Sequence, residues 1–243
     1  MKKSAVFFLS AILAASLMIP SHAVEYKALT GTPEVDGKLD DIYTQSQVIE
    51  VSNKSNKIWS SGTGADKSDI STKTYILHDD DYVYFCTVAE ESTIVDTGIK
   101  SGWQADAIEY WIKFNGTDKK KVSIDAFGTK IYGDRSDTEN FKFATTREDG
   151  KYVTEIAIPK EDFAKDSVEF SVQINDFLEK DAANGAAYGS QTAEDKFVLS
   201  SDKVVIKKEE PAPSSAAQTA DMGIIASIAA MAASTVLVFK KKH

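Results

Sequence analysis

The chain has 243 residues, of which 42% are hydrophobic and 27% charged, a composition typical of globular proteins and unlike that of a disordered or collagen-like chain. Residues 24–221 hold all 37 acids but only 23 lysines and arginines, a net charge of −14 that repels phosphate backbones and argues against nucleic acid as a partner. Cys86 is the only cysteine, which excludes an intrachain disulfide and a thiolate zinc cluster.

The first 23 residues have the pattern of a secretory signal peptide. Lys2 and Lys3 precede an apolar run over residues 5–19, and Pro20 and a small-x-small sequence ending at Ala23 follow. This order of charge, apolar core and cleavage site predicts a signal peptide over residues 1–23, cut after Ala23. The alternative is an uncleaved amino-terminal anchor.

Residues 24–206 are predicted to form one all-β domain. Short segments with period-two alternation are separated by clusters of Gly, Asn and Asp, which is typical of a sandwich. We expect a two-sheet antiparallel β-sandwich, with residues 52–71 and 179–194 as loops. The strands expected in chain order are 72–77, 82–89, 107–114, 121–127, 129–132, 140–145, 152–158, 169–175 and 196–199.

The last 37 residues have the composition of a linker and an anchor. Residues 207–221 contain Pro, Ser and Ala and are predicted to be a flexible linker. Residues 222–239 carry no charge, and eighteen residues in a helix span about 27 Å, close to the thickness of a bilayer core. We therefore predict a transmembrane helix over 222–239 and a basic cytoplasmic tail over 240–243, with the β-domain outside the cell.

A short sequence before this apolar run resembles the wall-sorting signal of Gram-positive surface proteins. The family pattern is L-P-x-T-G, and Thr219 matches it, whereas Ala217 and Ala220 stand where Pro and Gly are usual. A simple membrane anchor explains the same residues. Wall attachment and a membrane anchor both stay open, and either one predicts a protein secreted and anchored at the cell surface.

Five short motifs follow one another over about residues 30–200. The first reads V-D-G-K-L-D-D, and an aromatic hairpin, W-x-x-D-x-x-E, Y-x-x-E-x-A-I-P and F-x-x-Q-x-N-D come after it. They occupy residues 33–43, 75–87, 103–111, 150–159 and 170–176. In this order they resemble the motifs of the family 9 carbohydrate-binding modules of the DOMON-like β-sandwich superfamily.

This resemblance implies a non-catalytic domain that binds a polysaccharide or oligosaccharide, of a kind often appended to xylanases, with calcium as a cofactor in several members. It places Glu109, Gln173 and Asn175 at ligand-contacting positions and Trp103 at one ring of an aromatic clamp. The second clamp Trp has no equivalent, and Tyr188, the only ring in residues 188–196, is the candidate ligand-binding ring in its place. An Arg expected near Ser123 is also missing.

The pleat of the predicted strands places several polar side chains and one indole on a common face. Alternate residues of a strand point to opposite sides, so Ile108 and Tyr110 are predicted to be core. The side chains expected on the outer, solvent-facing side are Glu109, Trp111, Asp125, Gln173 and Asn175. Sugars bind to such a mixture of a ring with amides and carboxylates. An ordinary polar outer face is the alternative.

We find no catalytic constellation in the sequence. Asp106 and Glu109 are three residues apart in a strand and therefore face opposite sides, which argues against a glycosidase pair. We expect Asp106 to cap the strand edge instead. His78 is the only histidine between residues 24 and 242, and we expect it in a solvated turn, so a nucleophilic triad is not predicted.

Two runs of acids invite a calcium reading, because calcium takes oxygen ligands. They are residues 79–81 and 90–91, and no metal ligand can be assigned from the pattern alone. The resulting hypothesis is a monomeric, non-catalytic surface protein that binds glycan. Two alternatives stay open: a structural or adhesive protein that has lost sugar binding, and an accessory module of a glycan-degrading system.

Overall fold

The computed structural model describes residues 25–97, 104–115, 119–128, 131–135, 137–180, 183–193 and 195–205. The chain divides into two units, 1–206 and 207–243, and every described residue belongs to the first. The predicted signal peptide, linker and membrane helix lie outside the described residues. Within the described part, no helix is long and apolar enough to cross a membrane.

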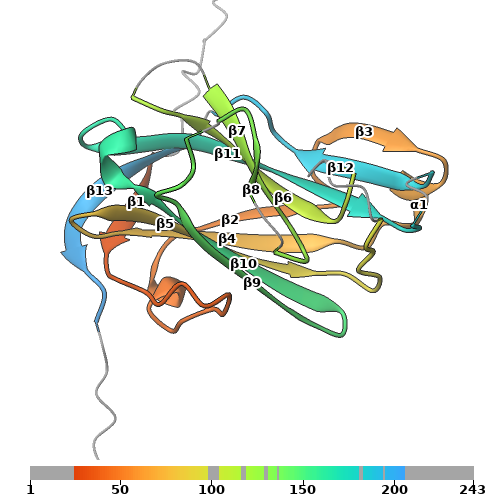
Figure 1. Ribbon diagram of the computed structural model, residues 1–243, viewed down its shortest axis with the longest axis horizontal. Coiled ribbons are helices and arrows are strands. Elements are labelled where there is room, and N and C mark those ends of the chain that lie inside the picture. Colours follow the sequence, from red (N-terminus) through yellow and green to blue (C-terminus); the bar gives the residue numbers. More distant parts are fainter. Residues whose placement is uncertain are drawn as a thin grey trace, which may run out of the picture. The chain divides into compact units, whose positions relative to one another are not determined.

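The described residues form thirteen strands and three short helical turns (Figure 1). The strands are β1 Glu25–Thr30, β2 Val48–Ser52, β3 Lys57–Ser61, β4 Ser71–His78, β5 Tyr82–Glu90, β6 Ala107–Lys113, β7 Lys119–Asp125, β8 Ile131–Gly133, β9 Lys142–Glu148, β10 Lys151–Pro159, β11 Ser167–Phe177, β12 Gly185–Gly189 and β13 Asp195–Lys203. The turns are η1 Tyr43–Gln45, α1 Gly64–Lys67 and η2 Lys160–Asp162. The predicted all-β class is confirmed.

The strands form two layers. One layer has the order β8-β7-β6-β11 and continues through β12 to β3, and the other has the order β4-β5-β10-β9 with β2 beside β4. Hydrogen bonding runs from one layer to the other through β13 and β1. The pairs are antiparallel, as predicted, except that β1 runs parallel to both β13 and β4. This amino-terminal strand was not predicted, and it joins the edges of the two layers.

The main core lies between the layers and contains the side chains that alternation assigned to it. Ile108 and Tyr110 of β6 are buried, and so is Phe170 of β11. The ring of Phe85 on β5 lies 5.2 Å from that of Tyr110 and 4.9 Å, edge-on, from that of Phe170. Burying each such side chain contributes about 1.5–3 kcal/mol, so this contact between β5, β6 and β11 holds the layers together.

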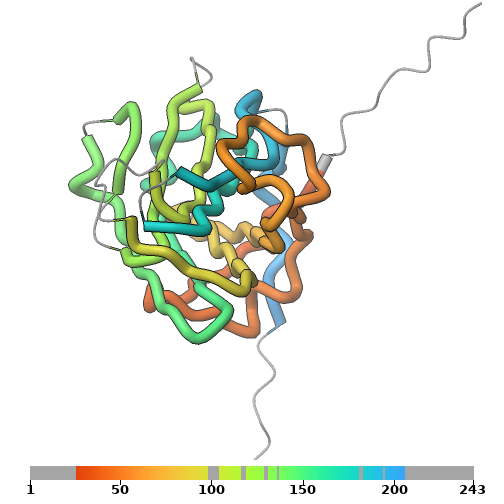
Figure 2. Tube along the Cα trace, turned by 90° about the vertical axis from the view of Figure 1, so that its right-hand side faces the viewer, coloured from red at the N-terminus to blue at the C-terminus, as the bar shows by residue number. Residues whose placement is uncertain are grey.

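A second, smaller core lies on the outer side of β4, β5 and β10. Tyr43 and Cys86 are buried there, so Cys86 is a core residue as predicted. The segment 31–47 covers this side of the sheet, next to the β9–β10 hairpin (Figure 2). The outer face of this layer is therefore covered where β4, β5 and β10 meet this segment, whereas Glu50 of β2 and Lys73 of β4, which pair with each other, stay exposed beside it.

A buried carboxylate fixes that covering segment. Glu155 Oε2 accepts hydrogen bonds from the backbone N–H groups of Asp36 at 2.9 Å and Gly37 at 2.7 Å. Gly37 has φ +80°, and a Cβ there would lie 2.8 Å from the backbone nitrogen of Thr146, so only glycine fits. The Asp-Gly and Y-x-x-E motifs are therefore two halves of one contact.

Two sequence expectations about loops and turns are wrong. Residues 52–71 and 179–194 contain β3, α1 and β12, which the polar composition of both segments hid. His78 is buried rather than solvated, because β4 extends to residue 78 and turns its side chain inward. The ring contacts Ser200 O at 3.0 Å and Lys160 Nζ at 3.1 Å.

Candidate functional site

The strand register brings the polar side chains of β6, β7 and β11 onto one face. Gln173 pairs with Glu109, and Asn175 pairs with Ala107, which in turn pairs with Asp125. Paired residues of antiparallel strands point to the same side. Glu109, Trp111, Asp125, Gln173 and Asn175 therefore share one face, called here the polar face. Trp103 lies outside the described residues.

A chain of hydrogen bonds runs through the polar face. Gln191 Nε2 donates to Gln173 Oε1 at 2.6 Å, and Gln173 Nε2 donates to Asn175 Oδ1 at 2.8 Å. Asn175 Nδ2 donates to Glu109 Oε1 at 3.1 Å, and Lys121 Nζ lies 3.5 Å from the same oxygen. Three amides, one carboxylate and one ammonium are thus held in fixed orientation, four of these five groups on the neighbouring strands β11, β6 and β7.

Lys121 supplies a positive charge to the polar face that the family resemblance did not predict. The expected Arg near Ser123 is absent, but Lys121 is two residues away on β7 and points to the same side as Ser123. Burial is the largest influence on Glu109 and raises the pKa of its carboxyl, whereas Lys121 and the Asn175 amide lower it. Lys121 and Glu109 thus form a charged pair on the polar face.

The polar face is less open than the sequence predicted. Glu109, Gln173 and Asn175 are at most 2% exposed. Lys121, with 18% of its side chain exposed, Gln191 and Trp111 are the partly exposed members. The three predicted contact residues therefore form a floor, and a ligand first meets the side chains that lie around it.

Trp111 is the aromatic surface of this face. The Nζ atoms of Lys119 and Lys121 lie 5.7 and 5.9 Å from its ring centroid. Its π-face attracts these cations and can equally receive the C–H groups of a sugar ring. Asp125 lies at the edge of the face, where its Oδ1 accepts a hydrogen bond from the backbone of Phe127 at 2.9 Å and closes the turn after β7.

Tyr188 does not belong to the polar face, which corrects the sequence assignment. It pairs with Ile174 on β11 and is buried in the main core. Alternation along β12 instead places Ala187 on the polar side, opposite Asn175. The register of β12, which the sequence did not predict, decides the direction of this ring.

A second polar site lies inside the domain, at the ends of β5, β6 and β11. Glu91, Asp106 and Asp176 each direct one carboxylate oxygen to a common point, with these atoms within 4.8 Å of one another. All three are at most 4% exposed. Asp106 accepts hydrogen bonds from the backbone of Phe177, at 2.6 Å, and of Val95, so it orients the strand edge as predicted.

The carboxylates of this cluster are not fully satisfied by protein donors. Both oxygens of Glu91 and Oδ2 of Asp176 are buried without a hydrogen-bond partner. Burial, helped by the neighbouring negative charges, raises the pKa of Glu91 to about 11 and that of Asp176 to about 6. Burial also raises the pKa of Asp106 to about 8, against its backbone hydrogen bonds. Such a cluster needs protons or a cation.

The acids of residues 79–81, the other run considered from the sequence, build a turn instead. Asp79 Oδ1 accepts hydrogen bonds from the backbone N–H groups of Asp81 at 2.9 Å and Tyr82 at 2.8 Å. Its other oxygen accepts from the hydroxyl of Tyr84 at 2.5 Å. These donors satisfy the carboxylate, so Asp79 stabilises the β4–β5 hairpin.

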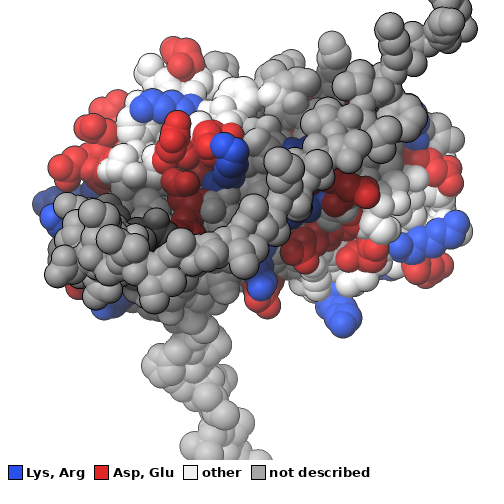
Figure 3. All heavy atoms as spheres, turned by 90° about the horizontal axis from the view of Figure 1, so that it is seen from below, with Lys and Arg blue, Asp and Glu red and all other residues white. Residues whose placement is uncertain are grey.

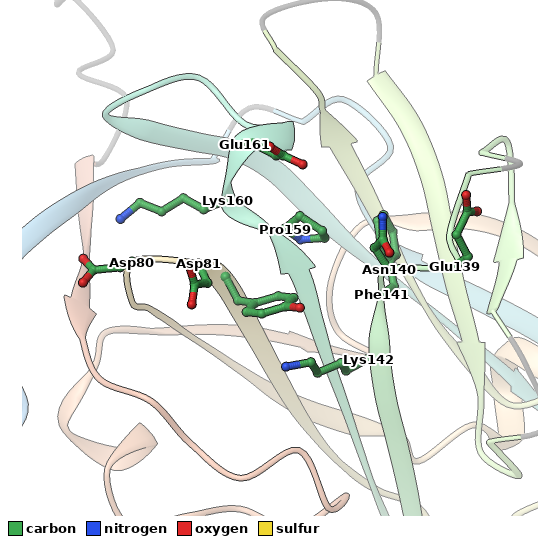
Figure 4. A pocket seen from close by; sticks show the side chains of 10 residues that line it. Asp80, Asp81, Glu139, Asn140, Phe141, Lys142, Pro159, Lys160 and Glu161 are labelled. Atoms are coloured by element: carbon green, nitrogen blue, oxygen red, sulfur yellow. The ribbon is translucent and has the colours of Figure 1, made fainter.

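A surface cleft of about 580 Å³ opens at the β4–β5 turn, in the other layer (Figure 4). Acids and lysines line it together with Tyr82, and Figure 4 shows Asp80 and Glu139 directed away from its centre. Lys142 Nζ lies 4.0 Å from the Tyr82 ring centroid and already covers that side of the ring. Acidic and basic side chains are also interspersed over the face seen in Figure 3. The cleft holds no oriented network comparable to the polar face.

A β-sandwich with an organised polar face on one layer defines the chain's folded part as a binding module. The family model described as carbohydrate family 9 binding domain-like matches residues 35–198, and the chain belongs to this family. Modules of this family bind carbohydrate without cleaving it, so the domain is non-catalytic, as predicted.

Known proteins similar to the chain include a xylanase and an exoglucanase. Endo-1,4-beta-xylanase A of Thermotoga neapolitana is 24% identical over 160 residues, and exoglucanase XynX of Acetivibrio thermocellus is 25% identical over 169 residues. The matches cover 62% and 65% of this chain but 14% of each enzyme. The chain thus corresponds to a small part of these relatives.

Two solved structures share the fold. Both are of a family 9 carbohydrate-binding module from Caldicellulosiruptor kristjanssonii, one in complex with glucose and one with cellotriose. Their TM-scores are 0.59 and 0.57 at 15% sequence identity. The alignments cover 76% and 77% of this chain and all of the compared chains.

Proposed function

We propose that the domain captures extracellular glycan at the polar face, with Trp111 as a stacking surface. The observation that carries this proposal is the chain of polar contacts from Gln191 to Lys121 across the three strands β11, β6 and β7, beside a partly exposed indole. Sugar hydroxyls require donors and acceptors at fixed positions, and sugar C–H faces require a ring. The polar face provides both within one patch.

The buried floor prepares the groups that meet the sugar. Asn175 and Gln173 are fixed by the hydrogen bond between them and by the bond from Asn175 to Glu109, so little side-chain entropy is lost when a ligand binds. Gln191 and Lys121 are partly exposed and attached to this floor. They present amide and ammonium donors to hydroxyl groups, while Glu109 holds Lys121 in place.

Binding of the purified full-length chain to immobilised polysaccharides, and calorimetry with glucose and cellotriose, test the proposal. Glu109→Gln removes the charge that holds Lys121 and keeps the shape of the side chain. We expect it to weaken binding at least about tenfold, since hydrogen bonds to charged groups contribute about 1.5–3 kcal/mol. Glu148→Gln, on β9 of the other layer, is the matched control. Equal retention of Glu109→Gln and wild-type protein would contradict this site.

A second candidate function is a structural or adhesive surface role without sugar binding. The observation that favours it is the burial of Glu109, Gln173 and Asn175, whose polar atoms already bond to one another. A glycan array separates the two functions. The first predicts specific sugar signals, and the second predicts none together with retention on protein or cell-wall material.

We further propose that calcium is the ion of the buried carboxylate cluster. The residues fit, because Glu91 and Asp176 offer buried oxygens without partners and the ligand set contains only oxygen. Calcium accepts roughly six to eight oxygen ligands and favours carboxylates. When bound, it would neutralise the charges of Glu91, Asp106 and Asp176 and join the ends of β5, β6 and β11.

Thermal unfolding with calcium or with EDTA tests the ion site. Calcium should raise the midpoint by several degrees in the wild type, because a ligand that binds only the folded state stabilises it. Glu91→Gln should remove most of that response. Glu90→Gln is the matched control, since Glu90 is the adjacent residue and its carboxylate is exposed at the end of β5. A calcium response that survives in Glu91→Gln would contradict the assignment.

We also propose that the domain is exported and held at the cell surface as a monomer. This rests on the sequences of residues 1–23 and 222–243. Deleting residues 222–243 should release the protein into the medium. Protease treatment of intact cells should then find no surface-bound protein to digest. An unchanged cell-associated fraction after the deletion would contradict anchoring by this segment.

A further inference from the structure

Trp59 extends the polar face to a strand that the sequence did not reveal. It lies in β3, where it pairs with Ala187 of β12, and Ala187 pairs with Asn175 of β11. Because paired residues point to the same side, Trp59 stands on the polar face, two strands from Asn175. Ala187 lies between them, and its side chain is a single methyl group, so larger neighbouring side chains can extend over it.

The environment of Trp59 fixes its ring without burying it. The ring centroid lies 5.5 Å from that of Phe177, which is buried on the same face. Phe177 in turn packs on Gly185, where a Cβ would lie 2.8 Å from the Phe177 Cδ1 atom. Trp59 is therefore supported by a rigid neighbour and remains partly exposed. A supported, accessible indole beside amides is the arrangement that stacks on sugars.

The two indoles of the face stand at opposite corners of the polar floor. Trp111 pairs with Ser171, whereas the row of Trp59 contains Asn175, four residues farther along β11. Three strand spacings and four residues along a strand separate their Cα atoms by roughly 20 Å. Gln173 lies close to the diagonal between them, and Asn175 lies to one side of it, in the row of Trp59. This span fits several linked pyranose rings and exceeds a single one.

We propose that Trp59 is a second ligand-contacting ring and that the site takes an oligosaccharide of several units along the diagonal from Trp111 to Trp59. The proposal rests on the proposed function, and it adds both a residue and a ligand length. Trp59 contacts the distal units of the chain, so its contribution grows with the number of units. A single sugar at the floor does not reach it.

Calorimetry with glucose, cellotriose and cellohexaose on the full-length chain tests the inference. Trp59→Leu keeps apolar packing on Phe177 but removes the ring, and Trp59→Phe keeps a ring. We expect Trp59→Leu to weaken cellohexaose binding about 3- to 10-fold and to leave glucose binding unchanged, whereas Trp59→Phe stays within about twofold of wild type. Ile58→Ala, the neighbouring residue of β3, controls for a general disturbance of the strand.

The outcomes distinguish a failure of this inference from a failure of the proposed function. If the wild type binds these saccharides and Trp59→Leu binds all of them equally well, Trp59 is only a packing residue and the inference is overturned. A uniform loss for glucose and cellohexaose, with a lowered thermal midpoint, also overturns it, because a structural role has no dependence on chain length. If the wild type binds no saccharide on the array or in solution, the proposed function itself fails, and the inference fails with it.

Discussion

The buried carboxylate cluster and the polar face solve the same physical problem in opposite ways. Both bury carboxyl groups away from water. In the cluster, Glu91 has no donor for either oxygen, and three acids face one another. In the polar face, Glu109 has an amide and an ammonium as partners.

The difference separates a site that needs protons or a cation to be stable from one whose groups satisfy each other. An unpaired buried charge costs several kcal/mol, so the cluster favours whatever neutralises it. A satisfied network has no such demand, and its ligand must gain affinity from the exposed members around it. In the roles proposed above, an ion bound at the cluster would therefore contribute to folding, and the polar face to recognition.

Removal of the ion should have the largest effect. Calcium present at roughly 1,000 times its Kd should stabilise the wild type by about 4 kcal/mol relative to EDTA, as urea unfolding would measure. Glu91→Met should lose this response and be more stable than the wild type in EDTA, because an apolar side chain replaces a buried carboxyl group that has no hydrogen-bond partner. Identical unfolding curves of the wild type with calcium and with EDTA would remove the contrast.

Glu155 is an intermediate case, a buried carboxylate with two backbone donors. Burial raises its pKa to about 7, although the N–H groups of Gly37 and Asp36 act against this. Between about pH 4.5 and 7 the folded state therefore holds a proton on Glu155 that the unfolded state releases. The contribution of this proton to the unfolding free energy is complete below about pH 4.5 and is lost as the pH rises to about 7. We expect a loss of about 3 kcal/mol over this range.

Glu155→Gln isolates that loss, since its unfolding free energy should lack this part of the pH dependence. Glu148→Gln should keep it. A pH profile of Glu155→Gln that matches the wild type would show that other groups produce the slope.

Breaking the network of the polar face should cost less. Asn175→Leu leaves Glu109 and Gln173 with fewer partners and should lower the unfolding free energy by about 1–3 kcal/mol, measured in urea. It should also abolish sugar retention. If the variant is as stable as the wild type, the hydrogen bonds of the floor do not stabilise the fold, and the comparison with the cluster loses its basis.

The smallest effect is expected at Trp111. Trp111→Leu should reduce saccharide affinity by about 0.5–1.5 kcal/mol, because a stacking ring contributes that amount beyond its buried area. The thermal midpoint should move little, since the ring is partly exposed. An affinity loss that appears only together with a large drop in the midpoint would assign Trp111 to packing instead.

The local pattern predicted the two strands that carry the floor. Alternation in residues 107–114 and 169–175 assigned the core and polar sides of β6 and β11 correctly. The Asp-Gly turn and the Y-x-x-E segment were recognised, but not their contact across 118 residues of sequence. Period-two patterns specify the side of a strand and contain no information on which strand lies next to it.

The parts that were missed depend on long-range pairing. β3 and β12 are five residues long each and are strands because they pair with each other and because β12 also pairs with β11, so neither the place of Trp59 nor the direction of Tyr188 was predictable. The cluster assembles from Glu91, Asp106 and Asp176 of three different segments. Only Glu91 belonged to a run that had suggested an ion, and a run of acids alone does not distinguish a ligand from a turn residue such as Asp79.

The parallel pairing of β1 with β13 has a consequence for biosynthesis. The first and the last strand of the domain, Glu25–Thr30 and Asp195–Lys203, complete the hydrogen bonding between the layers only by meeting each other. A nascent chain emerging from the ribosome amino-terminal end first therefore cannot close its sandwich until its final strand has been synthesised. Such distant pairing makes folding slow.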